Sequence, residues 1–345
     1  MTGPTSSFTD RNRPMVTRLN RPTVVGAAEV NSVADTHGLG HVVEFHECGE
    51  GMVNSNYRLV TASGTYLLRL YATERRREEI DLELSVLSHL HDAGFPVPRC
   101  VPALTGQSVG ELAGRLFTVL TYLPGRTLAQ DELGHEIVTQ VGAAYARMRL
   151  LLNGFTPAGR KENAEEALAD GLMAELLKQL ADEDPGVAAE VGDVWSEVSS
   201  LFTPPTERHV VHGDLYFANT VIDDHGNLVG FIDFDDAYLG SSQLDLALVV
   251  MEFATPTDNV IDLDLATALL RAYANAGGPR PDADVFPQAL LFLCCKFLCY
   301  TAQLQQQEGE PIEQNDYLRR LRHLRTRAVR DAVRRCVERA VDTVR

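Results

Sequence analysis

The amino-acid sequence predicts an α+β protein of two lobes, a small strand-rich lobe followed by a larger, mainly helical one. Three observations predict this architecture. The chain has 345 residues, which suits two units of ordinary domain size. Short apolar runs separated by turn residues occupy about residues 39–123, and the composition after residue 125 is rich in Ala, Leu and Glu. We therefore expect an N-terminal lobe over 23–123 and a C-terminal lobe over 124–345, preceded by a flexible tail over 1–22.

Four strands are expected in the N-terminal lobe. Residues 41–47 alternate loosely between apolar and polar side chains, and residues 57–61 and 65–71 are two apolar runs around a short turn that contains glycine. Two such runs are typical of a β-hairpin. Residues 116–123 form a further apolar strand, and Pro124-Gly125 interrupts the chain directly after it. The lobe boundary is therefore placed at this dipeptide.

A helix is expected over residues 75–93, between these strands. Its apolar residues recur at spacings of three and four, which places them on one face of a helix. They are Ile80, Leu84, Leu87 and Leu90. Gly94 ends the pattern, and the prolines that follow it prevent the helix from resuming.

The C-terminal lobe is expected to be helical except over residues 207–236, where short strands return. These strands are 208–211, 220–222 and 228–232, with a hairpin turn at 224–227 between the last two.

The C-terminal stretch, residues 317–345, contains ten arginines against three acidic residues. We favour one terminal amphipathic helix whose basic face is solvated. A phosphate-binding or nucleic-acid-binding arm is the alternative.

The overall charge is strongly acidic, with a formal net charge of −17. This charge makes a nucleic-acid partner unlikely, because nucleic-acid-binding domains are normally basic, and it suits a cationic or amine-bearing partner. Lysine is scarce, since Lys161, Lys178 and Lys296 stand against 28 arginines. Any step that requires a lysine therefore has three candidates.

The N-terminus lacks the apolar core of a signal peptide, and no apolar run is long enough to cross a membrane. The six cysteines form no Cys-x-x-Cys pair. Those at 294, 295 and 299 lie in an apolar stretch, so we expect them in a helix core rather than as soft metal ligands. We expect a cytoplasmic protein of a reducing compartment that has no membrane partner.

The strongest chemical signal is His-Gly-Asp-Leu-Tyr-Phe-Ala-Asn over residues 212–219, followed by Ile-Asp-Phe-Asp over 232–235. In the expected hairpin, Asp214 and Asn219 share one loop and Asp233 ends the next strand, so their side chains can converge. A carboxylate and an amide oxygen suit Mg²⁺, and a second carboxylate can accept a proton from an attacking hydroxyl. Phosphoryl transfer requires this combination. Asp and Asn are also common turn residues, which is the alternative interpretation.

This pattern resembles the aminoglycoside phosphotransferase/choline kinase family, small-molecule kinases with a protein-kinase-like fold of two lobes. The resemblance implies that Asp214 is the catalytic base and that Asn219 and Asp233 bind Mg²⁺. It also implies three supporting residues: His212, Asp235 beside the metal site, and Asp245, which would accept N–H bonds from the catalytic loop.

By the same resemblance, the N-terminal lobe would hold ATP through a glycine-containing loop. Gly49 and Gly51 lie between two strands, as in a loop that covers phosphates, and Asn54 stands where a third glycine is usual. An ordinary hairpin loop is the alternative.

The resemblance also implies a basic residue at the ATP phosphates and a hinge at the adenine. Arg69 occupies the position of the family's strand lysine and would pair with Glu83 on the following helix. Whether Arg69 fully replaces a lysine is left open. The hinge would offer backbone groups of Thr121 and Leu123 to the adenine.

A narrower likeness to the homoserine kinases lies mainly in the N-terminal lobe, in Gly-Met-Val-Asn-Ser-Asn-Tyr over residues 51–57 and Gly-Phe-Pro-Val-Pro over 94–98. It implies an ATP- and Mg²⁺-dependent kinase that phosphorylates a hydroxyl of a small amine-bearing metabolite. One alternative is a phosphotransferase for aminoglycosides or other antibiotics. Another is a catalytically silent nucleotide-binding protein.

The regions where acceptor specificity is expected, residues 155–200 and 254–285, contain many acids. They include Glu162, Glu165, Glu166, Asp170 and Glu175. These acids could recognise an amine, but we favour a solvated helix face. The identity of the acceptor and the oligomeric state are left open.

Overall fold

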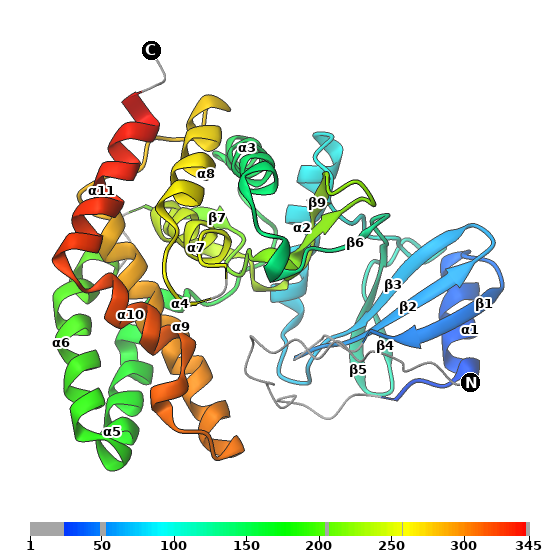
Figure 1. Cartoon of the computed structure of the whole chain (residues 1–345). Helices are drawn as coiled ribbons and strands as arrows, with labels where there is room; N and C mark the ends of the chain where they lie inside the picture. Colours follow the sequence, from blue (N-terminus) through cyan, green and yellow to red (C-terminus); the bar gives the residue numbers. More distant parts are fainter. Residues whose placement is uncertain (1–23, 49–52, 204–206, 257, 343–345) are drawn as a thin grey trace, which may run out of the picture.

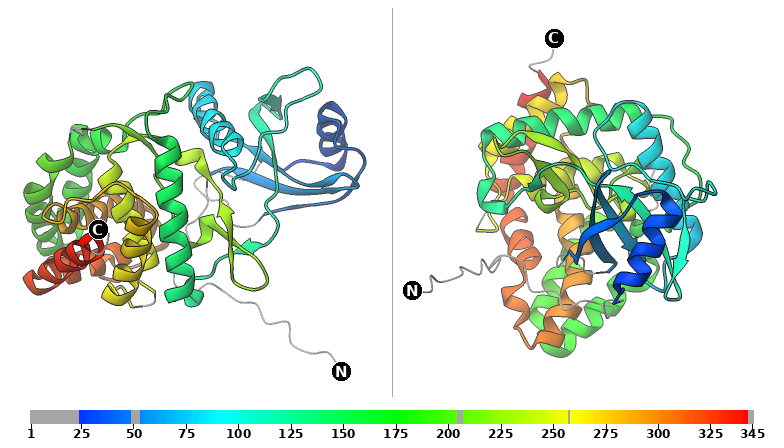
Figure 2. Two further views of the ribbon diagram at one scale, coloured as in Figure 1. Left: turned by 90° about the horizontal axis from the view of Figure 1, so that it is seen from above. Right: turned by 90° about the vertical axis from the view of Figure 1, so that its right-hand side faces the viewer.

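The computed structural model describes residues 24–48, 53–203, 207–256 and 258–342, and it confirms the two-lobe α+β fold. In Figure 1 the strand-rich lobe, blue to cyan, lies to one side of the helical lobe, green to red. The left view of Figure 2 shows the same separation from above. The expected tail over residues 1–22 lies outside the described residues.

The N-terminal lobe is built on a five-stranded antiparallel sheet with the order β1-β2-β3-β5-β4. Its strands are β1 (Val42–Glu47), β2 (Ser55–Thr61), β3 (Gly64–Leu70), β4 (Gly110–Leu112) and β5 (Arg115–Thr121). The expected hairpin is β2–β3, in continuous register from Ser55 opposite Leu70 to Thr61 opposite Gly64. Alternate residues of β2 are buried, because successive side chains of a strand point to opposite faces.

Two helices cover this lobe. The expected helix is α2 (Arg77–Asp92), and all four residues of its predicted apolar stripe are buried. The helix α1 (Ala27–His37) and the strand β4 were not expected from the sequence. Only four residues of α1 are buried, and they pack with residues of the sheet in a core of their own. A stripe that short is too weak to stand out in the sequence.

The C-terminal lobe is mainly helical. Its long helices are α3 (His135–Leu152), α5 (Met173–Glu183), α6 (Pro185–Phe202), α7 (Ser242–Phe253), α8 (Leu263–Asn275), α9 (Phe286–Glu308), α10 (Asp316–Leu324) and α11 (Arg327–Asp342). A short helix, α4 (Ala164–Ala167), leads through the π-helical turn η2 (Leu168–Leu172) into α5. The remaining short turns are η1 (Gln130–Glu132), η3 (Phe217–Asn219), η4 (Phe234–Asp236) and η5 (Ile312–Gln314).

Two small sheets interrupt the helices, as expected. One pairs β7 (His209–Val211) with β10 (Tyr238–Gly240). The other has the order β6-β8-β9, formed by β6 (Arg126–Thr127), β8 (Thr220–Ile222) and β9 (Leu228–Phe231). The predicted strands and hairpin turn of this region are therefore present. They set the loop after β7 beside the chain that follows β9.

The expectation of one terminal helix is wrong, because the chain breaks between α10 and α11. The break follows Leu324, where the Thr326 hydroxyl donates to the His323 carbonyl and the Thr326 carbonyl begins the hydrogen bonds of α11. A threonine side chain that bonds nearby backbone competes with a continuous helix.

Most of the described arginines of this stretch are exposed, as expected, but Arg320 is buried and pairs with Glu252, and others pair with acids at the surface. Arg322 and Arg325 both pair with Glu190 of α6, at 2.9 and 2.7 Å. Arg330 pairs with Glu197 of the same helix at 2.6 Å. Much of the basic charge of this stretch therefore meets acids of the same chain.

Two of the three cysteines of α9 lie in the helical core, as expected, whereas Cys299 is partly buried and lines a cavity. Cys294 and Cys295 are fully buried, and burial raises the pKa of the Cys294 thiol to about 12. Among the residues that the structure describes, no cluster of three His, Cys, Asp or Glu is arranged to hold a metal ion. Within the same residues, no helix combines the length and the apolar character needed to cross a membrane.

Close packing of α3 against α8 depends on Gly142. A Cβ at this position would lie 2.3 Å from the Leu269 carbonyl oxygen of α8, a contact that backbone must move to relieve. We expect Gly142→Ala to lower the free energy of unfolding by about 1–3 kcal/mol, as overpacking does. Urea unfolding measures this change.

Gly134→Ala is the matched control. Gly134 directly precedes α3, has an extended backbone, and has no atom within 4 Å of an added Cβ. Its replacement is expected to cost less than about 1 kcal/mol. Equal stability of the two variants would show that the contact of α3 with α8 tolerates a methyl group.

Candidate active site

The loop over residues 212–219 connects β7 to β8 and carries Asp214. Gly213 within it has φ +82°, and a Cβ there would lie 2.4 Å from the Asp236 carbonyl oxygen, so the position requires glycine. The carboxylate of Asp245, in the first turn of α7, accepts the backbone N–H groups of Gly213 at 3.0 Å and His212 at 3.2 Å. It also accepts the hydroxyl of Tyr145 at 2.7 Å. Asp245 thereby ties the start of the loop to two helices.

His212 joins this loop to the end of β9. Its Nε2 lies 3.1 Å from the Ile232 carbonyl oxygen, and the Asp214 N–H lies 3.4 Å from its Nδ1. The tautomer with the proton on Nε2 satisfies both contacts. The side chain is fully buried, and this burial lowers the pKa of His212. The ring is therefore neutral near pH 7.

This neutral histidine predicts a loss of stability in mild acid. In the unfolded chain a histidine binds a proton below about pH 6.5, whereas folded His212 resists protonation. Stability contributed by His212 is therefore present above pH 6.5 and falls as the pH drops. We expect wild type to lose up to about 1.4 kcal/mol more per pH unit than His212→Gln.

Urea unfolding between pH 7.5 and 5 measures this difference. His91→Gln, a change of an exposed histidine in the last turn of α2, should keep the slope of wild type. A His212→Gln variant with the wild-type slope would rule out a neutral buried ring.

Asn219 and Asp233 lie on adjacent chain segments beside Asp214. The Asn219 side-chain amide donates to the Asp214 carbonyl oxygen at 2.8 Å and lies 3.3 Å from Asp214 Oδ2. The Ile232 N–H donates to the Asn219 carbonyl oxygen at 3.0 Å, which places Asp233 next to this pair. Asp233 has φ +67° and ψ +61°, a left-handed conformation that is uncommon outside glycine.

The oxygen atoms of Asn219 and Asp233 fit a magnesium ion. Because the Asn219 amide nitrogen faces Asp214, its amide oxygen remains for a ligand. Asp233 Oδ1 is buried and accepts no hydrogen bond from the described residues, although Arg69 Nη2 lies 2.8 Å away as an ion pair. Amide and carboxylate oxygens are donors that Mg²⁺ prefers.

Arg69 of β3 is a buried cation held by two carboxylates, with only 4% of the residue exposed. Its Nη1 lies 2.9 Å from Glu83 Oε1 of α2, its Nη2 contacts Asp233, and its Nε donates to Asn56 Oδ1 at 3.2 Å. The Tyr71 hydroxyl donates to Glu83 Oε2 at 2.8 Å. Burial raises the pKa of Glu83, and the adjacent guanidinium opposes that rise. The expected phosphate contact and the expected metal ligand therefore face each other.

The predicted phosphate loop is described only in part. Gly49 and Gly51 lie outside the described residues. The side chain of Asn54 donates to Asp235 Oδ2 at 2.6 Å and accepts the Ala72 N–H at 3.1 Å. Asn54 thus contacts the C-terminal lobe.

Asp235 receives a second contact from the N-terminal lobe. Arg75 Nη2 donates to its Oδ2 at 3.0 Å. Burial and the neighbouring Asp233 and Asp236 raise the pKa of Asp235 to about 7, against the effect of Arg69 and Arg75. Asp235 therefore bridges the two lobes beside the site.

The two predicted hinge residues, Thr121 and Leu123, differ in whether their backbone groups are already hydrogen-bonded. The Thr121 N–H donates to the Arg99 carbonyl oxygen at 2.8 Å, and the Thr121 hydroxyl accepts the Arg99 N–H at 2.8 Å. The described residues make no hydrogen bond to the backbone of Leu123. Leu123 therefore has its backbone groups available for a ligand, whereas the Thr121 N–H is already used.

A cavity of about 570 Å³ opens beside Asp214. Lys161 lies in its wall, where it pairs with Asp236 and donates to the Asp235 carbonyl oxygen at 2.9 Å. Although burial opposes it, the Lys161 ammonium lowers the pKa of Asp236 to about 2. Lys161, like Arg75, was not expected as a site residue. Its rarity as one of three lysines was the available signal.

The acids of residues 155–200 are not a uniformly solvated helix face. Glu162 and Glu175 line the cavity. Glu165 is fully buried and accepts the Tyr238 hydroxyl, which is incompatible with the expected solvation. Glu162 and Glu175 are exposed, as expected, and Glu166 is a partly exposed partner of Arg208.

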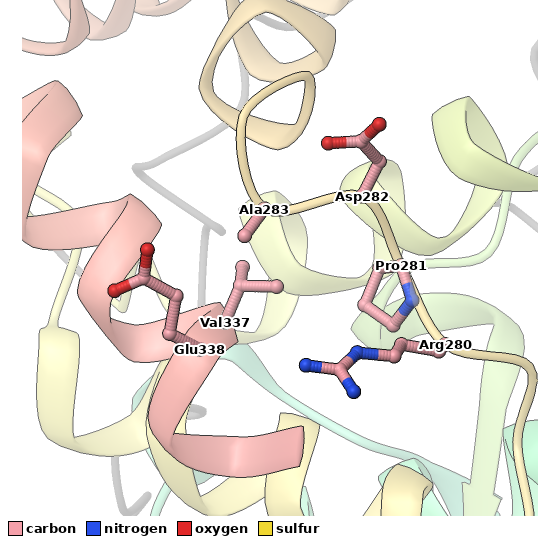
Figure 3. A pocket seen from close by; sticks show the side chains of 6 residues that line it. All are labelled: Arg280, Pro281, Asp282, Ala283, Val337 and Glu338. Carbon is pink, nitrogen blue, oxygen red and sulfur yellow. The ribbon is translucent and has the colours of Figure 1, made fainter. Parts of the chain in front are cut away.

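A second, smaller cavity of about 370 Å³ lies between the segment leading into α9 and the helix α11 (Figure 3). Its lining residues are Arg280, Pro281, Asp282, Ala283, Val337 and Glu338. None of the residues of the predicted kinase site lines it, so the cavity at Asp214 is the one that belongs to the site.

Comparisons with known proteins show the family and the fold of this chain. Residues 44–283 match the phosphotransferase enzyme family. Homoserine kinase of Acidiphilium cryptum is 30% identical over 264 residues, which cover 75% of this chain and 79% of that protein. Homoserine kinase of Gluconobacter oxydans is 27% identical over 318 residues, 88% of this chain and 98% of that protein.

Solved structures show the same fold at lower identity. An amicoumacin kinase superposes with a TM-score of 0.62 at 16% identity, covering 91% of this chain and 93% of that one. Choline kinase from Streptococcus pneumoniae superposes with a TM-score of 0.59 at 16% identity, covering 87% and 99%. This chain belongs to the phosphotransferase enzyme family and is a small-molecule kinase.

Proposed function

We propose that this kinase is ATP- and Mg²⁺-dependent and phosphorylates a hydroxyl of a small amine-bearing metabolite, in the manner of a homoserine kinase. The observation that carries the proposal is the position of Asp214. It lines a cavity of about 570 Å³ and at the same time contacts Asn219, next to Asp233. The cavity is large enough for an amino acid, and its wall holds the acids Glu162 and Glu175.

Asp214 would orient the acceptor hydroxyl and take its proton. As the hydroxyl oxygen forms a bond to the γ-phosphorus of ATP, the bond from that phosphorus to the β,γ-bridging oxygen breaks and ADP leaves. The proton of the hydroxyl passes to the Asp214 carboxylate. Asp245 and His212 would act as positioning residues, because they hold the backbone of the loop that carries Asp214.

Asn219 and Asp233 would hold Mg²⁺, which neutralises phosphate charge during phosphoryl transfer. Arg69 would contact the ATP phosphates, and Glu83 would keep its guanidinium in place. Leu123 would offer backbone groups to the adenine. A cytoplasmic location stays a prediction from the sequence.

A panel of acceptors tests the proposal. The purified chain is incubated with ATP, Mg²⁺ and L-homoserine, L-serine, choline, spectinomycin or kanamycin, and ADP release and the phosphorylated product are measured. We expect the highest kcat/KM for L-homoserine or another small hydroxy amino acid. Omission of Mg²⁺ is expected to abolish turnover.

Two outcomes would contradict the proposal. Selective phosphorylation of an antibiotic would replace it by an antibiotic phosphotransferase. Nucleotide binding without turnover for every acceptor would favour the catalytically silent protein.

A further inference from the structure

Lys296 is a buried cation in the wall of the cavity beside Asp214. It lies within α9 in an otherwise apolar stretch, and only 5% of the residue is exposed. The other two lysines differ from it. Lys161 is paired with Asp236, and Lys178 is exposed on α5. Lys296 is therefore the lysine whose position the site described so far does not explain.

The described residues give Lys296 no carboxylate partner within ion-pair distance. Its one hydrogen bond among the described residues goes to the Tyr238 hydroxyl at 3.5 Å, the limit of a hydrogen bond, and that hydroxyl donates its own proton to Glu165. The charge of Lys296 also helps to lower the pKa of Asp236, but that carboxylate is paired with Lys161. The centroids of the Tyr238 and Phe297 rings lie 5.3 and 5.5 Å from Nζ. An ammonium group has three donors, and a buried charge is costly unless it is paired.

The other two cations of the cavity wall, Lys161 and Arg320, are already paired. Arg320 contacts Glu252 at 2.7 Å and donates to Asn259 at 3.1 Å. A ligand in this cavity would therefore meet one buried cation, Lys296, that has no ion pair among the described residues. It would also meet several acids without an ion pair there, among them Glu162 and Glu175. Charges of both signs suit a ligand that carries both.

We propose that Lys296 binds a carboxylate of the acceptor, so that the substrate is a hydroxy amino acid rather than an amino alcohol or an amino sugar. The inference rests on the proposed function, and it names the chemical class of the acceptor. The carboxylate supplies the counter-ion that Lys296 lacks. The amine of the same molecule then faces the acidic part of the wall.

A structural role for Lys296 is the competing explanation. Glu165 could balance its charge through Tyr238, because one Glu165 oxygen accepts the Tyr238 hydroxyl and the other, buried, has no partner among the described residues. In that case Lys296 would stabilise the fold and would not distinguish one acceptor from another. The experiment must therefore compare ligands with and without a carboxylate.

L-Homoserine and 3-amino-1-propanol form such a pair, since the second is the first without its carboxylate. Calorimetric titration of wild type and Lys296→Met with each ligand measures binding without any need for turnover. We expect wild type to bind L-homoserine about 30-fold or more tightly than the amino alcohol, the effect of losing one partner of a buried charge pair. We expect Lys296→Met to abolish this preference, Lys296→Arg to keep part of it, and both to bind ATP as wild type does.

Lys178→Met is the matched control and should keep the full preference. An equal affinity of wild type for the two ligands would overturn the inference, and so would an unchanged preference in Lys296→Met. If Lys296→Met does not fold, the inference is still tested by Lys296→Arg and by the affinities of wild type for the two ligands. Turnover of the same two acceptors separates the proposals: absence of phosphorylation despite selective binding would contradict the proposed function alone.

Discussion

Asp214→Asn is expected to lower kcat for acceptor phosphorylation by about 10²–10⁴-fold, the usual contribution of a general base. The amide has nearly the size and shape of the carboxylate but cannot take the proton of the attacking hydroxyl. The fold of the loop should survive, because Asn219 also donates to the Asp214 backbone carbonyl at 2.8 Å, and Asp245 holds the preceding residues. Steady-state kinetics with the best acceptor measures the effect.

Two comparisons make this result specific. The affinity for ATP and the melting temperature of Asp214→Asn should remain those of wild type. Asp224→Asn, which changes an exposed aspartate of the β8–β9 turn, should keep full activity. Turnover of Asp214→Asn within threefold of wild type would exclude the assigned role.

Arg69→Met is expected to lower the free energy of unfolding by about 3–5 kcal/mol, the cost of leaving a buried charge without its partner. Arg69 and Glu83 are 4% and 1% exposed, and water cannot replace the missing guanidinium. The same change also removes the ion-pair partner of Asp233. Urea unfolding measures the stability, and the KM for ATP is measured at a temperature where the variant is folded.

The double variant Arg69→Met with Glu83→Gln separates stability from nucleotide binding. Removing both charges should recover part of the lost stability, because the buried Glu83 is then no longer a charge without a partner, although Asp233 still lacks Arg69. The KM for ATP should stay raised, since no cation remains at the phosphates. Arg69→Lys should keep the charge but lose at least one of the three contacts that the guanidinium makes. A double variant with wild-type KM for ATP would show that Arg69 is a structural residue only.

Local elements of this fold could be predicted because their signals lie within a few neighbouring residues. The β2–β3 hairpin and α2 follow from apolar periodicity, and β8 has the predicted bounds of 220–222. The convergence of Asp214, Asn219 and Asp233 follows from a second predicted hairpin, formed by β8 and β9, which pair directly.

Two contacts that the sequence did not predict depend on partners that are distant in the chain. Asn54 contacts Asp235 across 181 positions. Glu165 is buried because Tyr238, 73 positions away, lies against it. Neither contact can be predicted from composition, because Asn, Asp and Glu are most often found on solvated surfaces.

By itself, the sequence determined the fold class through apolar periodicity and composition, and the family resemblance through its motifs. Spacing around one hairpin also brought together the three oxygen-bearing residues of the candidate site. The tertiary structure alone decided how the charged residues are paired. It set Arg69 between Glu83 and Asp233, paired several arginines of α10 and α11 with acids of α6, and buried Lys296 without an ion pair in the part of the chain that the structure describes. The physical reason is that a charge is costly or stabilising according to what lies within a few ångströms of it, and packing of distant segments determines that neighbourhood.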